Sequence, residues 1–460
     1  MGLFLLLLRA DGYADWAVTN YPSKTGNMAI IYSVVNLDTG ELALIDGGYV
    51  EDGPQVKELM DQYGTVNTWI LTHFHEDHCG AFNALWSNQK DRVGRVFVSA
   101  IDPQLLLKNA QSWDKTGYLS SFLKKTSGDK KITSLHSGTE MNVVGLKMNV
   151  FLAGDDPVVF ENLESIWNNC SVVFKLSGRR DAVLFLGDLQ DETIGNYLVE
   201  KYGAGKLRAE YVQAAHHGHW GSSTSFYEVV KPEFMFFDAP AWLMNGTQFT
   251  AGKLKKWCEK RGIKTTDYRA GATTIIIRSS DRYDLSDIAE ITGLRDMKYN
   301  GSERKTGFKL RYKKNLYNLQ KTLGELKEGR DYTVSYSNYV DVGTAVVTVS
   351  GINRFSGTLR GEYQITMGRK PASVKAKVRK NKVTVTWKAP KRKFRNLVKS
   401  VQVQYATDPE FREDVLTKQV GKKKTSTILK LSKGKKYFIR VRFAFEAGYS
   451  KWSKVKKVRR

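Results

Sequence analysis

The densest group of metal-ligating side chains is the segment Thr72–His78, which reads Thr-His-Phe-His-Glu-Asp-His. In an extended segment His73 and His75 project to the same side, while Asp77 and His78 turn toward the following helix. Mixed nitrogen and oxygen donors suit zinc, manganese or iron rather than calcium. The spacing therefore predicts a transition-metal site rather than a solvated histidine-rich loop.

Two later segments place further ligands at the ends of apolar stretches. Residues 182–186 form an apolar stretch followed by Gly187 and Asp188, and residues 212–215 are followed by His216 and His217. A carboxylate at the end of a buried strand is costly unless a cation faces it. If the strand ends converge, Asp188 can bridge two metal ions about 3.5–4 Å apart. Either histidine of the doublet fits as the remaining ligand.

Such a site would be a hydrolytic centre. Two divalent ions, zinc or manganese, lower the pKa of a shared water from about 15.7 toward about 7, so no side-chain nucleophile is needed. Asp77, His217 or His219 would then deliver a proton to the leaving group. Four polar side chains near the motifs are candidate substrate-binding residues: Asn169, His219, Ser222 and Ser223. For Asn169 and the two serines the alternative role is to cap a strand or a turn.

The elements around these motifs alternate in type between residues 16 and 281. Apolar stretches predict strands at 28–35, 41–45, 68–72, 95–99, 171–176, 182–186 and 234–237. Helical patterns occupy 80–88, 102–112, 193–202 and 251–261. This alternation predicts an α/β layered domain. Beyond residue 282 short strands alternate at period two, which predicts two all-β sandwich domains at 282–368 and 369–460.

The order of the motifs resembles the metallo-β-lactamase superfamily, over roughly residues 16–280. An aspartate after a strand (Asp46) precedes His-x-His-x-Asp-His, an isolated aspartate and a final histidine. The resemblance implies an αββα sandwich with a dinuclear site at one edge of its two sheets. It also implies that Asp46 orients a ligand. One metal ion would be held by His73, His75 and Asp188. The other would be held by Asp77, His78, Asp188 and one of His216 and His217.

A narrower resemblance points to phosphodiesters. The segments Asn168–Val173 and His216–Ser223 look like the hydrolase domain of bacterial DNA-uptake competence proteins and like the choline-releasing esterases of cell-wall teichoic acid. In both groups an Asn-Asn-x-Ser stretch replaces the superfamily's usual extra histidine. Where those relatives have Gly-His-Pro, this sequence has Met244–Phe249, so a histidine that contacts substrate or metal in them has no counterpart here.

The positive charge belongs to the C-terminal fifth of the chain. Residues 369–460 contain 30 Lys and Arg against five acids, a net of +25, so the other 368 residues hold 72 − 30 = 42 basic and 47 − 5 = 42 acidic residues. Residues 331–365 resemble a bacterial immunoglobulin-like repeat, and residues 371–458 resemble a fibronectin type III domain. Such a basic domain is expected to attract polyanions, either cell-wall polymer or DNA.

These features favour an exported, cell-wall-associated hydrolase acting on nucleic acid or on choline phosphate of a wall polymer. The alternatives are a wall-binding adhesion protein with an inactive hydrolase domain, and a lactone or acyl-ester hydrolase. Residues 1–15 include six consecutive apolar residues, which fit either a signal peptide whose start has been lost or a buried first strand. No stretch reaches transmembrane length. Three isolated cysteines predict no disulfide framework.

Overall fold

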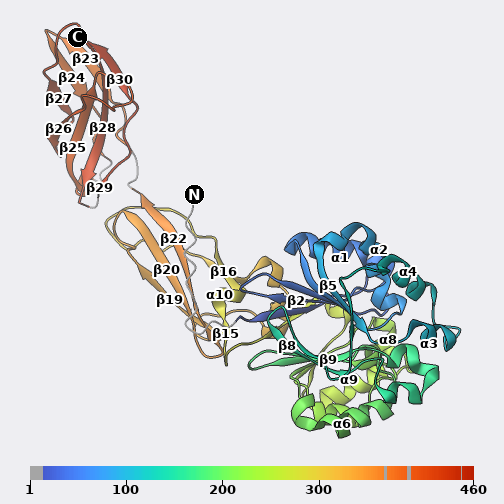
Figure 1. Ribbon diagram of the computed structural model, residues 1–460. Coiled ribbons are helices and arrows are strands. Elements are labelled where there is room, and N and C mark those ends of the chain that lie inside the picture. Colours follow the sequence, from blue (N-terminus) through green and yellow to red (C-terminus); the bar gives the residue numbers. More distant parts are fainter. Residues whose placement is uncertain (1–13, 367–369, 391–394, 447) are drawn as a thin grey trace. The chain divides into compact units, whose positions relative to one another are not determined.

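A computed structural model describes residues 14–366, 370–390, 395–446 and 448–460 (Figure 1). The chain forms two compact units. The first contains residues 1–288, 312–325 and 353–356, and the second contains residues 289–311, 326–352 and 357–460. The predicted signal segment, apart from residues 14 and 15, lies outside the described residues.

Two seven-stranded sheets form the first unit. One has the order β14-β1-β2-β3-β4-β5-β6, with β1 Trp16–Asn20, β2 Ile31–Asn36, β3 Leu42–Asp46, β4 Val66–Leu71, β5 Val93–Ser99, β6 Ile132–Leu135 and β14 Thr273–Ile277. The other has the order β13-β12-β11-β10-β9-β8-β7, with β7 Glu140–Val143, β8 Leu146–Leu152, β9 Val173–Ser177, β10 Ala182–Phe185, β11 Tyr211–Gln213, β12 Phe234–Phe236 and β13 Lys264–Thr266.

Each sheet changes from antiparallel to parallel pairing at one strand. β3 pairs antiparallel with β2 and parallel with β4. β10 likewise pairs antiparallel with β9 and parallel with β11. The carboxyl ends of β3 and β4, and of β10 and β11, therefore open at one edge of each sheet.

Helices cover the outer faces of the sheets, with α1, α2 and α4 on one side and α6 and α9 on the other (Figure 1). This is the expected αββα arrangement. The helices of this unit are α1 Gly53–Tyr63, α2 Glu76–Gln89, α3 Pro103–Lys108, α4 Gly117–Thr126, α5 Ile166–Asn169, α6 Glu192–Leu207, α7 Thr224–Val230, α8 Ala241–Asn245, α9 Ala251–Lys260, α10 Leu285–Ile288 and α11 Leu319–Leu323. The helix predicted at 102–112 is shorter than expected.

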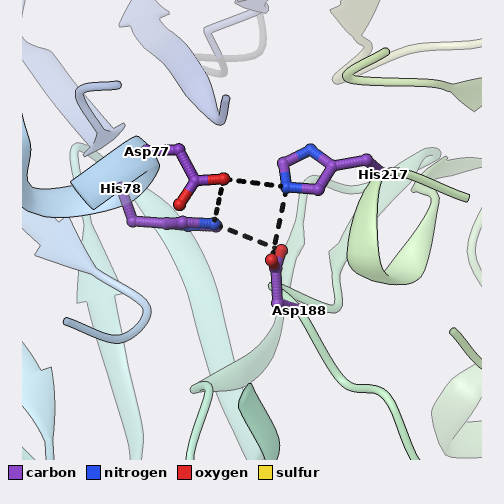
Figure 2. Close-up of side chains that lie close together, drawn as sticks. All are labelled: Asp77, His78, Asp188 and His217. Atoms are coloured by element: carbon purple, nitrogen blue, oxygen red, sulfur yellow. Dashed lines mark ion pairs between the residues drawn. The ribbon is translucent and has the colours of Figure 1, made fainter. Parts of the chain in front are cut away.

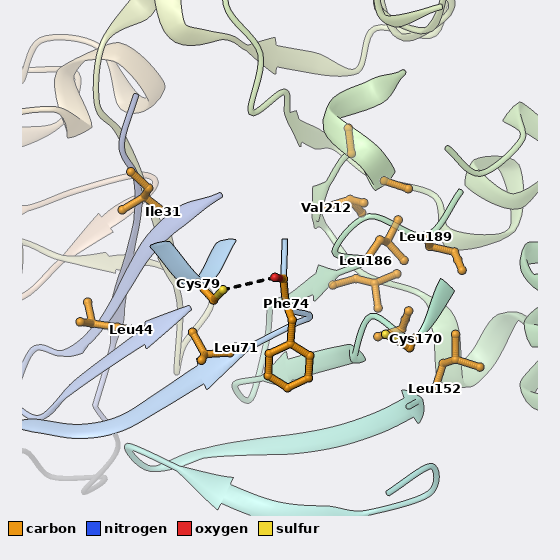
Figure 3. Close-up of a cluster of buried hydrophobic side chains, with 14 of the residues drawn as sticks. Ile31, Leu44, Leu71, Phe74, Cys79, Leu152, Cys170, Leu186, Leu189 and Val212 are labelled. Atoms are coloured by element: carbon orange, nitrogen blue, oxygen red, sulfur yellow. Dashed lines mark hydrogen bonds between the residues drawn. The ribbon is translucent and has the colours of Figure 1, made fainter. Parts of the chain in front are cut away.

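Alternate strand residues build two separate cores. On β2, Tyr32 and Val34 join a core made almost wholly of strand residues from both sheets, while Ile31 and Val35 join one that also contains helix residues. This follows from the period-two geometry of strands that are buried on both faces. Figure 3 shows part of the helix-side core, in which the Cys79 thiol donates to the Phe74 carbonyl at 3.4 Å. All three cysteines are buried and free.

Two short segments predicted within the middle β-domain pack with the first unit. Helix α11 lies against β14, the edge strand of the first sheet: Thr322 Oγ1 donates to the Thr274 carbonyl at 2.9 Å, and Lys321 Nζ donates to the Ala272 carbonyl at 2.6 Å. Strands β15 (Tyr283–Asp284) and β21 (Phe355–Ser356) also pair within this unit. Covering an exposed edge strand protects its unpaired backbone groups.

The second unit is built of strands. A four-stranded sheet has the order β17-β22-β20-β19, beside a two-stranded sheet of β16 and β18. These strands are β16 Ala289–Thr292, β17 Met297–Lys298, β18 Lys309–Tyr312, β19 Tyr332–Ser337, β20 Gly343–Gly351 and β22 Thr358–Thr366. The immunoglobulin-like assignment and the boundaries at 282 and 369 stay predictions.

The C-terminal part of this unit has two facing sheets, β23-β24-β27 and β26-β25-β28-β29 with β30 paired to β28. The strands are β23 Lys375–Arg379, β24 Lys382–Thr386, β25 Val398–Ala406, β26 Leu416–Gly421, β27 Ser426–Leu429, β28 Lys436–Phe445, β29 Gly448–Tyr449 and β30 Lys456–Arg459. Between β29 and β30, the Ser450 and Ser453 hydroxyls accept hydrogen bonds from the Phe443 and Val441 N–H groups of β28.

Phe185 tests the core between the two sheets of the first unit. Its ring is 1% exposed and lies 5.1 Å from both Tyr32 and Phe174. Phe185→Ala should lower the free energy of unfolding by about 3–5 kcal/mol, because it removes buried area and leaves a cavity. Phe160→Ala, at a 39% exposed ring, is the control and should change it by less than about 0.5 kcal/mol. Denaturant unfolding measures both, and an equal loss for the two variants would contradict this packing.

Candidate metal centre

Four strand ends bring the predicted ligands together. Asp46 is the last residue of β3, and the histidine motif follows β4. Asp188 follows β10, and the histidine doublet lies in a 3-10 turn, Ala215–Gly218, after β11. Helix α2 begins at Glu76 rather than at the predicted residue 80, so Asp77 and His78 lie in its first turn.

Asp77, His78, Asp188 and His217 form a compact group of ligand atoms, all within 4.8 Å of one another (Figure 2). His78 Nε2 lies 3.3 Å from Asp188 Oδ1. His217 Nε2 lies 3.2 Å from Asp188 Oδ2 and 3.3 Å from Asp77 Oδ2. All four residues are buried, with exposed fractions of 8% or less.

The rings of His78 and His217 are each held by a hydrogen bond at Nδ1, on the side away from the four-residue group. Their Nε2 atoms therefore face that group. His78 Nδ1 lies 2.8 Å from Asp46 Oδ2, and His217 Nδ1 lies 3.0 Å from the Asp238 carbonyl. Since a carbonyl or carboxylate only accepts, Nδ1 of each ring carries a proton, and Nε2 faces the group, where it presents a lone pair whenever the ring is neutral. Within the described chain, both Nε2 atoms and Asp188 Oδ1 are buried without a hydrogen bond. A cation would satisfy all three, so the donor set fits a metal ion.

A second pair of nitrogen atoms lies beside this group. His73 Nε2 is 3.0 Å from His75 Nδ1, and the ring centroids of His73 and His78 are 3.9 Å apart. The opposite nitrogen atoms are held elsewhere: His73 Nδ1 by Ser171 Oγ at 3.2 Å, and His75 Nε2 by Asp114 Oδ1 at 2.8 Å. Two imidazole nitrogens, His73 Nε2 and His75 Nδ1, thus lie side by side next to the four-residue group.

Charge in the buried group is strongly unbalanced. Burial lowers the pKa of His217, but Asp188 and Asp77 outweigh it and raise that pKa to about 10. The same opposition raises the pKa of His78 well above its usual range. Burial together with His78 lowers the pKa of His73 far below its usual range, so that ring is neutral. The buried carboxylates of Asp77 and Asp188 are stabilised only by nearby positive charge, which either protons on the histidines or divalent ions can provide.

Unusual backbone conformations accompany the site. Asp46, His216 and His217 have φ values of +53°, +51° and +55°. Non-glycine residues in this region are strained and persist only where the surroundings hold them. Gly187 also has positive φ, and a Cβ there would lie 2.8 Å from the Ser171 Cβ. Glycine is therefore needed for the chain to deliver Asp188.

The structure separates the two histidines of the doublet. His217 Nε2 lies within the four-residue group, whereas His216 Nε2 lies 3.9 Å from Asp188 Oδ2 and its Nδ1 is buried without a hydrogen bond. His217 thus has the geometry of a ligand. His216 and His219 both line an adjacent cavity, so they are placed to meet a bound molecule.

The other predicted substrate-binding residues have mixed environments. Asn169 Oδ1 accepts from the Gln190 N–H, and its Nδ2 is buried without a partner in the described chain. The Ser222 hydroxyl is likewise buried and unpartnered. Ser223 caps helix α7 by accepting from the Phe226 N–H, which matches the capping alternative.

Sequence reasoning missed several residues that hold the ligands. Asp114 is 39 residues from His75 and carries no motif of its own. The Asp238 carbonyl that orients His217 belongs to the backbone and leaves no signal in the sequence. Ser171 lies in a quoted segment, but nothing in that pattern pairs it with His73.

Family comparisons identify the two ends of the chain. The metallo-β-lactamase superfamily matches residues 27–96, which include the histidine motif, and the fibronectin type III domain matches residues 369–459. The N-terminal region is therefore a metallo-β-lactamase superfamily domain with a hydrolase fold, and the C-terminal region is a fibronectin type III domain. Comparison with curated proteins finds no match.

Solved structures similar to this chain include representatives of both domains. A metallo-β-lactamase fold protein from Bacillus subtilis is 10% identical, with 55% of this chain and 95% of that chain covered and a TM-score of 0.36. A metallo hydrolase from Ignicoccus hospitalis is 12% identical, with 57% and 99% covered and a TM-score of 0.35. A fibronectin type III domain of human contactin 1 is 25% identical, with 21% and 79% covered and a TM-score of 0.19.

Asp46→Asn tests whether ring orientation controls metal affinity. The variant removes the carboxylate that fixes the Nδ1 proton of His78, and losing such a partner costs about 10–100-fold in affinity. Competition with a chromogenic chelator measures zinc affinity. Asp91→Asn, at an exposed acid, is the control. Unchanged affinity in Asp46→Asn would contradict the assigned role.

Proposed function

We propose that the N-terminal domain hydrolyses a phosphodiester, with two divalent ions, zinc or manganese, in its active site. The observation that carries the proposal is the adjoining pair of donor groups. His73 Nε2 and His75 Nδ1 would hold one ion, with Asp188 shared, and the four-residue group of Asp77, His78, Asp188 and His217 would hold the other. When bound, the ions would lower the pKa of water and offset charge on the phosphoryl oxygens.

The side chains around this centre divide the remaining tasks. Asp77 and His217 are the proposed proton carriers within the ligand group, where they lie 3.3 Å apart. His219 lines the cavity instead, and its Nδ1 accepts from the Thr250 N–H at 3.1 Å. Its proton therefore sits on Nε2, where it can be donated to a substrate oxygen. His216 shares that cavity.

A phosphodiester is favoured by the motifs around the centre. Asn169 and Ser171 lie in the Asn-Asn-x-Ser stretch that resembles phosphodiester-cleaving relatives, and Ser171 Oγ contacts both His73 Nδ1 and the Asp188 N–H. In this proposal the protein acts outside the cell, at the cell wall. Among the described residues, no helix has the length and apolar character needed to cross a bilayer.

Asp188→Asn is the sharpest test of the catalytic proposal. The wild-type protein should bind two equivalents of zinc or manganese and hydrolyse at least one of bis(p-nitrophenyl) phosphate, p-nitrophenyl phosphorylcholine and single-stranded DNA. Because Asp188 would contact both ions, the variant should bind less metal and lose about a thousandfold or more in rate.

Asp91→Asn again serves as the exposed-acid control. Turnover of lactones or acyl esters, with none of any phosphodiester, would move the assignment to that other ester class. Two bound metal equivalents without any turnover would instead favour an inactive hydrolase domain in a wall-binding protein.

The fibronectin type III domain is proposed to hold an anionic polymer. Lys436 lies opposite Arg459 in the pairing of β28 with β30, and the neighbouring Lys457 and Arg459 lower the pKa of Lys436. Like charges across a strand pair destabilise the sheet, and a polyanion would relieve that repulsion. All three side chains are exposed.

Salt dependence tests this surface. Replacing Lys436, Lys457 and Arg459 with Gln in one variant should weaken binding to teichoic acid or DNA. It should also flatten the slope of log K against log salt concentration by roughly 0.7–0.9 per lost phosphate contact. A matched triple variant, with Gln at Lys298, Lys305 and Lys309, removes the same charge elsewhere. Equal effects of the two variants would show that net charge, rather than this surface, decides binding.

A further inference from the structure

A second cavity, of about 400 Å³, lies at the opposite ends of the strands from the candidate metal centre. Its lining residues include Tyr211, Phe234 and Lys264, which are the first residues of β11, β12 and β13. Those three strands run parallel, so their amino ends lie together, whereas His217 follows the carboxyl end of β11. The cavity is therefore separate from the candidate metal centre, and its volume is that of a small-molecule site.

Part of the cavity wall comes from segments beyond residue 282. The lining residues in those segments are Tyr283 of β15, Thr322 and Leu323 of α11, and Arg354 just before β21. The Tyr283 N–H donates to the Arg354 carbonyl at 3.0 Å, and Arg354 Nη2 donates to the Leu323 carbonyl. These bonds hold the wall in place before any ligand arrives, which reduces the entropy lost on binding.

The buried part of the lining is apolar. Four of its side chains are almost wholly shielded from solvent: Phe234 is 7% exposed, Ile275 3%, Ile276 1% and Leu323 9%. A hydrocarbon that lies against such side chains loses contact with water, and this loss is favourable. The lining thus favours a ligand with an apolar body.

The charged lining residues carry a small positive excess. They are Arg261, Lys264, Arg354 and Glu233. Arg261 is already neutralised by Glu228, because its Nε donates to Glu228 Oε1 at 2.6 Å. Three cations less Glu233 and Glu228 leave a net charge of +1, which suits one carboxylate better than a doubly charged phosphate. Lys264 is exposed, and its Nζ has neither an ion pair nor a hydrogen bond within the described chain.

We infer that this cavity binds a small organic carboxylate with an aliphatic chain. The carboxylate would lie at the exposed side of the cavity, where Lys264 and Arg354 can donate charge-assisted hydrogen bonds to its two oxygens. The chain would lie against Ile275, Ile276 and Leu323. The inference does not depend on the proposed hydrolytic activity, because the two sites share no residue.

Calorimetry with hexanoate, acetate and hexanamide tests the charge and the chain separately. The full-length protein is first treated with a chelator, so that no probe can bind a metal ion. Hexanoate should bind at least about tenfold more tightly than acetate, which lacks most of the chain, and than hexanamide, which lacks the charge. Asp188→Asn should bind hexanoate as the wild type does, because Asp188 lies at the other ends of the strands.

Variants of the two cations locate the site. Lys264→Gln should weaken hexanoate binding about two- to fivefold, as expected for an exposed ion pair. Lys260→Gln, at an exposed lysine of α9 that does not line the cavity, is the matched control and should bind as the wild type does. Arg354→Gln should weaken binding as Lys264→Gln does. Denaturant unfolding of this variant shows whether losing the bond to the Leu323 carbonyl has disturbed the fold.

Four results would overturn the inference. The first is the absence of saturable hexanoate binding at millimolar concentration. Equal affinity for hexanoate and hexanamide would show that the cavity is merely apolar, and equal affinity for hexanoate and acetate would show that only surface charge attracts the probe. An equal loss of affinity in Lys264→Gln and Lys260→Gln would show that binding does not take place in this cavity.

Discussion

Two buried carboxylates that face the Nε2 atoms of His78 and His217 are the constraint on which the rest of this structure depends. Asp77 and Asp188 are both within reach of His217 Nε2, and 8% or less of either residue is exposed. Buried acids of like charge are costly unless cations neutralise them. The fold supplies the neutralising partners from four strand ends, and the strained backbone at Asp46 and His216 accompanies that convergence.

The two sheets explain why residues so far apart in the chain can meet. Each sheet changes from antiparallel to parallel pairing at a strand whose end contributes to the site: β3 ends in Asp46, and β10 precedes Asp188. The core between the sheets fixes their separation through ring contacts such as that of Tyr32 with Phe185. Small errors in that packing would be felt at the ligands, because protein interiors are nearly incompressible.

Net charge distinguishes the C-terminal fifth of the chain from the rest. All the net charge lies in residues 369–460, and the rest of the chain balances to zero. In the proposed function, a basic domain attracts the polymer and a separate, neutral domain recognises the bond to be cleaved. The cavity beside the candidate metal centre is likewise not basic, because its described lining residues include aromatic and acidic side chains but no lysine or arginine.

The sequence predicted what is encoded locally. The α/β alternation, the strands at 28–35 and 41–45 and the His73–His78 motif were recognisable because apolar periodicity and ligand spacing are short-range properties. Contacts made across the fold were not recognisable. Asp114 reaches His75 from 39 residues away, and the packing of α11 on β14 joins segments about 50 residues apart. The choice of His217 over His216 as the ligand with suitable geometry depends on backbone angles that no local pattern specifies.

Anomalous X-ray scattering from crystals grown with zinc or manganese would examine the metal centre most directly. The account predicts two peaks about 3.5–4 Å apart. One should lie between His73 Nε2 and His75 Nδ1, the other among Asp77, His78 and His217, with Asp188 touching both. A single peak, or peaks away from these atoms, would contradict it.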